Sequence, residues 1–215
     1  MSTKADYWKL RESFYKCRDF EINNLWQKSI LLTAFFVLDF TIYANVVTKL
    51  FETIEDANKV IVFHEICSAL CIIGIVLSLI WIMMAKGSKA WYELYENAIC
   101  SIEREKAIDI PESYKMGNIY GERPIDNNIF TNNAGCYSPS KLNIIIGRLF
   151  LIIWNSIYII HLVFEIIWIM NSKINGECSC FHFVICLFIF IIILIIYITS
   201  FINAWAKSSF LEKNH

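Results

Sequence analysis

The chain has 215 residues, of which 57% are hydrophobic and 15% aromatic, with only 7 glycines and 3 prolines. This composition excludes a disordered chain and a small secreted scaffold, and it is typical of a polytopic helical membrane protein. The 19 basic residues nearly balance the 20 acidic ones, so there is no electrostatic reason to expect nucleic acid as a partner.

The first 28 residues are polar and of mixed charge. They lack the short basic region and the small-residue cleavage site of a secretory signal, so we expect no cleaved signal peptide. Residues 1–28 instead predict a cytosolic amphipathic helix, with Arg11 and most other charged side chains off the main face. This helix lies at the membrane surface, packs on a partner helix or covers its own subunit. Its predicted face contains Tyr7, Leu10, Phe14, Cys17, Glu21 and Leu25.

Four apolar stretches are long enough to cross the roughly 30 Å apolar core of a bilayer as helices. The predicted spans cover residues 29–50, 60–85, 142–170 and 180–204. A short acidic link between the first two requires them to run antiparallel. The predicted fold class is therefore all-α, a polytopic membrane protein with four transmembrane helices plus cytosolic amphipathic helices.

The segment between the second and third spans, residues 86–141, is predicted to be a cytosolic helix followed by a long loop that contains all three prolines. At the end of the loop, Ser138 resembles a helix N-cap and Pro139 a first-turn residue. Residues 205–215 form a predicted tail. Together with residues 1–28, these segments carry fifteen Lys and Arg residues, against two or three in the outer turns. This asymmetry predicts that both termini and the loop are cytoplasmic.

Each of the first three predicted spans carries polar residues at helical spacing. In the first span, Asp39 points about 160° away from Thr41, so we expect that helix to lie between neighbours. The second span has a face of small or polar side chains that suits close packing in lipid: His64, Cys67, Ser68, Cys71, Gly74 and Ser78. The third span has one polar stripe: Trp154, Tyr158, His161, Glu165, Trp168 and Ser172.

Ionisable residues of these spans share one predicted depth near the outer boundary. Glu65 and Glu165 each lie five residues inside the outer end of a span, and His64 adjoins Glu65. His161 is one turn deeper, and His182 starts the fourth span at a similar height. Three interpretations remain open: a structural hydrogen-bond layer, a pH-responsive or ion-conducting element, and a metal site that also uses Cys178 and Cys180. The intramembrane candidates are Asp39, His64, Glu65, His161 and Glu165.

Two further functional classes have weaker support in the sequence. A metal site on His64, Cys67 and Cys71 would place three ligands on one straight helix, which cannot close a tetrahedron by itself. No phosphate-binding glycine loop, HExxH or GxSxG motif is present, so nothing indicates catalysis. We therefore predict no enzyme activity, no metal and no cofactor.

Several stretches together resemble one family, the RipA-like octameric bacterial inner-membrane proteins. They are residues 18–22 (RDFEI), 25–29 (LWQKS), 86–93 (KGSKAWYE) and 137–143 (YSPSKLN). The resemblance implies a large ring in the bacterial inner membrane, associated in a pathogen with growth inside host cells and with envelope homeostasis. The cytosolic candidates that it indicates are Arg18, Asp19, Glu21, Trp26, Lys86, Gly87, Lys89, Trp91, Glu93, Ser138 and Lys141.

The sequence thus predicts a non-enzymatic homo-oligomer of the inner membrane that supports envelope or ion/pH homeostasis, with a pore as one version. Its expected partners are other copies of itself, in an octamer as the resemblance implies, and membrane lipid. The alternative is a membrane scaffold that recruits a soluble partner through the cytosolic loop and the amino-terminal helix.

Overall fold

The computed structural model describes residues 4–53, 55–104, 108–116 and 137–174. This part of the chain folds into three long α-helices and contains no strand, so the predicted all-α class is confirmed for it. The predicted fourth span at 180–204 and the tail at 205–215 lie outside the described residues. So do His182, Cys178 and Cys180.

The long helices are α1 (Lys4–Glu52), α2 (Ala57–Arg104) and α3 (Pro139–Ile174). A short 3-10 helix, η1 (Glu112–Tyr114), follows α2. The predicted helix start at Ser138 and Pro139 is confirmed, because α3 begins at Pro139 and the amide of Leu142 donates to the Ser138 carbonyl.

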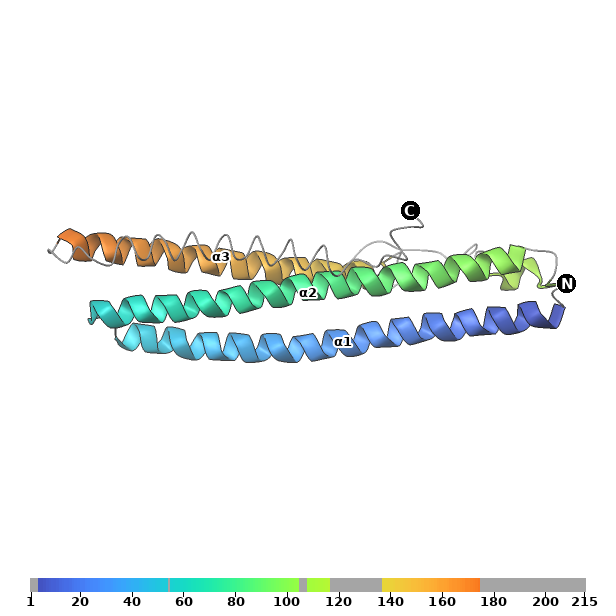
Figure 1. Cartoon of the computed structure of the whole chain (residues 1–215), viewed down its shortest axis with the longest axis horizontal. Coiled ribbons are helices and arrows are strands. Elements are labelled where there is room, and N and C mark those ends of the chain that lie inside the picture. The colour runs from blue at the N-terminus through green and yellow to red at the C-terminus, as the bar shows by residue number, and fades with distance from the viewer. Residues whose placement is uncertain (1–3, 54, 105–107, 117–136, 175–215) are drawn as a thin grey trace, which may run out of the picture. The chain divides into compact units, whose positions relative to one another are not determined.

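Each of the three helices is long and apolar enough to cross a membrane. Figure 1 shows α1 as one unbroken ribbon, and the predicted change at residue 28 from cytosolic helix to span lies inside it. No proline interrupts α1 or α2. A crossing needs only about 20 residues, so the polar start of α1 and the polar end of α2 are not required for it.

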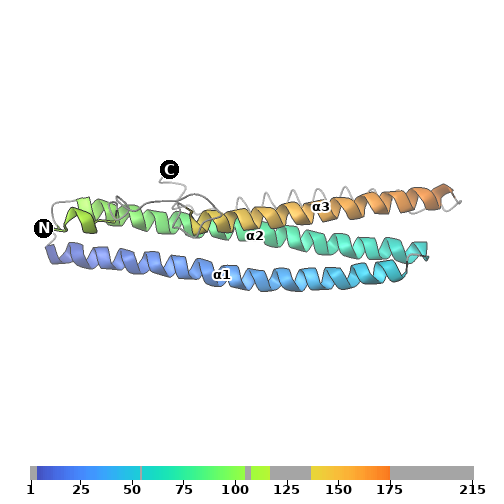
Figure 2. The same ribbon diagram turned by 180° about the vertical axis from the view of Figure 1, so that it is seen from behind.

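A tight turn connects α1 to α2. The side chain of Asp56 accepts a hydrogen bond from the backbone amide of Lys59 at 3.3 Å, the N-cap arrangement that satisfies a free amide in the first turn. Asp56 also pairs with the Lys59 ammonium at 3.0 Å. The two helices lie side by side in both views (Figures 1 and 2).

Contacts along the chain divide it into two compact units. Unit 1 comprises Met1–Ser29 and Met84–Ile144, and unit 2 comprises Ile30–Met83 and Ile145–His215. Each unit therefore takes part of α1, part of α2 and part of α3. We describe the two units separately.

A buried carboxylate organises unit 1. Glu103 is 2% exposed, and its Oε1 accepts hydrogen bonds from Nε of Arg11 at 2.8 Å and from the Tyr15 hydroxyl at 3.5 Å. Its Oε2 accepts the backbone amide of Met116 at 2.7 Å. Glu103 thus joins α1, α2 and the segment after η1.

This contact adds Arg11 to the predicted face of the amino-terminal helix. The other members of that face are half-buried or buried, whereas Leu10 is 44% exposed. Arg11, expected off that face, pairs with Glu103 instead. The reason is that a charge-assisted hydrogen bond to a buried carboxylate favours the arginine over a leucine at this position.

Aromatic side chains fill much of the core of unit 2. Phe36 stacks on Phe150 with ring centroids 4.3 Å apart, and Trp81 contacts both rings at 5.8 and 5.9 Å. We call these three residues the aromatic layer. Gly74 lies directly against the Trp154 ring, so that the backbone of α2 approaches α3 closely.

Candidate functional site

A series of hydrogen bonds joins the three helices of unit 2 through His161. The hydroxyl of Tyr43 on α1 lies 2.8 Å from Nε2 of His161 on α3. The other ring nitrogen of His161, Nδ1, lies 2.8 Å from Nδ1 of His64 on α2. His64 and His161 are both buried. Because both nitrogens of His161 have partners, the orientation of its ring is fixed. We call Tyr43, His161 and His64 the histidine relay.

More polar side chains adjoin the relay in the interior of unit 2. Cys71 lies near Asp39, Tyr43 and Tyr158. Tyr158 lies near Glu165, and Glu165 lies near Glu65. With the relay they form a polar column, consisting of Asp39, Tyr43, His64, Glu65, Cys67, Ser68, Cys71, Tyr158, His161 and Glu165.

The intramembrane candidates fall into this column. Asp39, His64, His161 and Glu165 are all buried, and Glu65 is half-buried. The polar stripe predicted on the third span is buried from Trp154 to Glu165. Ser172 is within α3, but its side chain lies outside the described part of the structure.

The sequence argument missed Tyr43, although a signal was present. Tyr43 follows Asp39 by four residues and therefore lies on the same face of α1. Thr41 and Asn45 are exposed on that helix and donate to carbonyls one turn earlier, those of Val37 and Thr41, at 2.6 and 2.8 Å. The prediction that this helix lies between neighbours stays a prediction.

The metal-site interpretation has no assembled set of ligands within the described ranges. Within them, no group of three His, Cys, Asp or Glu side chains could hold a metal ion. Cys67 and Cys71 are buried free thiols on α2. The remaining ligands of the metal interpretation, Cys178 and Cys180, lie outside those ranges.

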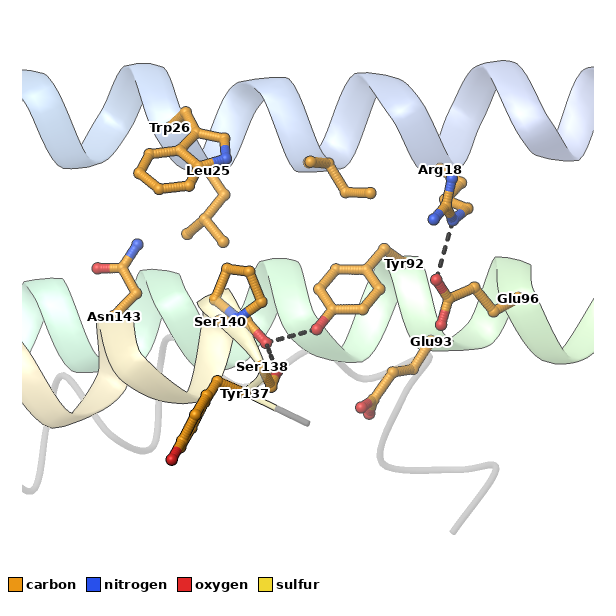
Figure 3. Close-up of a pocket in the computed structure, with 12 residues that line it drawn as sticks. Arg18, Leu25, Trp26, Tyr92, Glu93, Glu96, Tyr137, Ser138, Ser140 and Asn143 are labelled. Atoms are coloured by element: carbon orange, nitrogen blue, oxygen red, sulfur yellow. Dashed lines mark hydrogen bonds and ion pairs between the residues drawn. The ribbon is translucent and has the colours of Figure 1, made fainter. Parts of the chain in front are cut away.

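Unit 1 contains a pocket of about 420 Å³ between α1, α2 and the start of α3 (Figure 3). The stretches that carry the family resemblance, far apart in sequence, meet there. The lining residues are Arg18, Ile22, Leu25, Trp26, Tyr92, Glu93, Glu96, Tyr137, Ser138, Pro139, Ser140 and Asn143. All except Glu96 belong to those stretches. We call this cavity the motif pocket.

Charged groups at one end of the motif pocket are paired. Nε of Arg18 donates to Glu96 at 2.9 Å, and its Nη1 donates to Asp19 at 3.0 Å. Burial lowers the pKa of the Arg18 guanidinium, but the hydrogen bonds and charges of Glu96 and Asp19 outweigh burial and raise that pKa above its ordinary value. Glu93 pairs with Lys89. Arg18 therefore remains cationic.

Hydroxyl groups line the side of the motif pocket formed by the start of α3. The Tyr92 hydroxyl lies 2.5 Å from Oγ of Ser140, which lies 3.0 Å from Oγ of Ser138 (Figure 3). Asn143 donates to the Ser29 hydroxyl at 2.7 Å. No histidine is among the described residues that line the pocket.

The cytosolic candidates divide into three groups. Arg18, Trp26, Glu93 and Ser138 line the motif pocket. Asp19 and Lys89 pair with lining residues. The rest are not lining residues: Glu21, Lys86, Gly87, Trp91 and Lys141. Tyr92, Ser140 and Asn143 were not singled out, although they belong to the quoted stretches, and Glu96 had no such signal.

Comparison with known proteins identifies one family. The sequence profile of the Octameric membrane protein family (8xMP) matches residues 8–164, which include the motif pocket and every member of the polar column except Glu165. No curated protein and no solved structure is significantly similar to the chain.

Proposed function

The chain belongs to the Octameric membrane protein family (8xMP), and from this premise we propose that eight copies form a non-enzymatic complex for ion or pH homeostasis in the bacterial inner membrane. In this proposal each copy crosses the membrane four times, with both termini and residues 86–141 in the cytoplasm. The complex moves protons along the polar column. The observation that carries the proposal is the histidine relay.

The relay has the geometry of a proton-transfer chain. A neutral imidazole donates from one nitrogen and accepts at the other. In one arrangement the Tyr43 hydroxyl donates to Nε2 of His161, and Nδ1–H of His161 donates to Nδ1 of His64. In the reverse arrangement each of these two hydrogen bonds has the opposite direction. Conversion of the first into the second transfers the Tyr43 proton to Nε2 of His161 and the Nδ1 proton of His161 to His64. His64 then releases its Nε2 proton, while another proton restores Tyr43, so one proton enters and one leaves.

The position of the relay supports a functional role. Ionisable residues within membrane helices are costly and commonly mark proton or ion pathways. The relay joins residues that are separated by 118 and 97 positions in the sequence. The buried carboxyl group of Asp39 lies one helical turn before Tyr43 on the same face of α1.

The test is proton flux into liposomes that contain the purified octamer, at about pH 5.5 and 7.5 to bracket histidine titration. His161→Gln keeps a polar side chain but cannot pass a proton from one nitrogen to the other. We expect it to lower the flux at least tenfold. The control is Asn155→Ala, because Asn155 is exposed on α3 and, in the described part of the chain, its amide donates to the carbonyl of Leu151 at 2.7 Å. Equal flux in wild type and His161→Gln would contradict the proposal.

The motif pocket favours a second candidate function, a membrane scaffold that binds a soluble protein. Its support is that the four stretches that carry the family resemblance line one cavity in unit 1. In this alternative, Asp39→Asn and Glu165→Gln are silent, whereas Arg18→Ala or deletion of part of 109–133 abolishes recovery of the partner with the purified octamer. Glu12→Ala, an exposed change on the same helix, serves as the control.

A further inference from the structure

Four buried polar atoms in unit 2 have no hydrogen-bond partner among the described residues. They are Oδ2 of Asp39, Oγ of Ser68, Nε1 of Trp154 and the hydroxyl of Tyr158. Each of these side chains is at most 5% exposed. Buried polar groups in proteins are nearly always paired, and water is their usual partner when protein atoms are not. Four orphans in one unit therefore indicate an occupant.

The four groups face one region of the interior. Trp154 and Tyr158 are four residues apart on α3, and Ser68 and Cys71 are three apart on α2, so each pair shares a helix face. Cys71 lies near both Asp39 and Tyr158. Phe40, the neighbour of Asp39, stacks on Trp154 with ring centroids 4.4 Å apart.

The chemistry of the four groups selects the occupant. The indole of Trp154 can only donate a hydrogen bond, whereas an ionised Asp39 can only accept one. A metal cation cannot accept from Trp154, an anion is repelled by Asp39, and a lipid chain satisfies none of the four. Water both donates and accepts. We propose that Asp39, Ser68, Trp154 and Tyr158 surround a cluster of internal waters that carries a hydrated proton between the histidine relay and Asp39.

The aromatic layer closes this water site on one side. Phe36 precedes Asp39 by one helical turn, and Phe150 precedes Trp154 by one turn. Phe36 and Trp81 are almost fully buried; Phe36 stacks on Phe150, and the Trp81 ring meets both at an angle. The ionisable groups on the other side are His64, Glu65, Cys67, Tyr43, His161 and Glu165. The proton therefore reaches Asp39 from the side of the relay.

This inference rests on the proposed function, but it can be tested without flux. Protein labelled with ¹⁵N-tryptophan, in lipid bilayers as the octamer, is transferred to D₂O, and each indole N–H signal is followed by solid-state NMR. Loss of a signal in Trp154→Phe or Trp81→Phe assigns these two among the seven tryptophans. We expect the Trp154 signal to disappear within minutes and the Trp81 signal to persist for at least tenfold longer. Protection of both overturns the water cluster, and equally fast exchange of both overturns its closure by the aromatic layer.

Tyr158→Phe provides a second test because it removes an orphaned hydroxyl and little else. If water occupies the site, the variant loses proton flux, at least threefold, and its melting temperature does not rise. If the interior is dry, removal of an unpaired group raises the melting temperature and leaves flux unchanged, which overturns the proposal. A rapidly exchanging Trp154 in an octamer without flux would refute the proposed function and leave the water site standing. A protected Trp154 indole in an octamer that conducts protons would refute the water site and leave the proposed function standing.

Discussion

Each unit contains a buried carboxylate, and the two carboxylates differ in their hydrogen-bond partners. In unit 1, the buried Glu103 has a partner for each carboxylate oxygen, and one of these is the guanidinium of Arg11. In unit 2, Asp39 has an oxygen with no partner in the described part of the chain. A fully paired carboxylate stabilises the fold, whereas a carboxylate with an open position can exchange a proton.

Glu103 is therefore expected to be important for stability. Glu103→Gln leaves Arg11 without a counter-charge, and we expect it to cost about 2–4 kcal/mol, less than a fully buried pair because Arg11 is 21% exposed. Thermal unfolding measures this loss, and hydrogen exchange at the Met116 amide reports the broken bond locally. Glu12→Gln is the control, since its pair with Lys16 is exposed and should have no measurable effect. Unchanged Met116 protection would contradict the role of Glu103.

At the scale of elements, the spacing of apolar and polar residues along the sequence predicted the features that depend on local sequence alone. The stripe on α3 from Trp154 to Glu165 is buried, and α3 begins at Pro139. The period could not identify partners across the fold. Arg11 and Glu103 are 92 residues apart, and each alone reads as an exposed charge on a helix. Tyr43 was missed for the same reason, because its partner His161 lies on another helix.

The two glycines of α2 provide an element-scale prediction. A Cβ at Gly74 would overlap the Trp154 ring, whereas a Cβ at Gly87 would meet nothing within 4 Å. We expect Gly74→Ala to destabilise the protein by about 1–3 kcal/mol through overpacking. Gly87→Ala should stabilise it by about 0.5–1 kcal/mol, because alanine loses less backbone entropy in a helix. Thermal unfolding of the two variants side by side measures both effects, and similar melting temperatures would show that α2 and α3 are not closely packed at Gly74.

At the scale of the whole molecule, family membership and three long apolar helices establish a membrane protein of an octameric family. The polar column and the motif pocket belong to different units and support different functions. Composition and hydropathy predicted the membrane class because they depend on the whole chain. They could not predict that the stretches at 18–29, 86–93 and 137–143 line one pocket, since this depends on tertiary packing.

The most direct test of the central claim is proton flux through the wild-type complex. Octamers, verified as such by native mass spectrometry, are placed in liposomes under an imposed membrane potential, and internal pH is followed at about pH 5.5 and 7.5 outside. Our account predicts flux above that of empty liposomes at both pH values, because the relay passes protons between neutral imidazoles. Verified octamers with no flux above empty liposomes at either pH would contradict it.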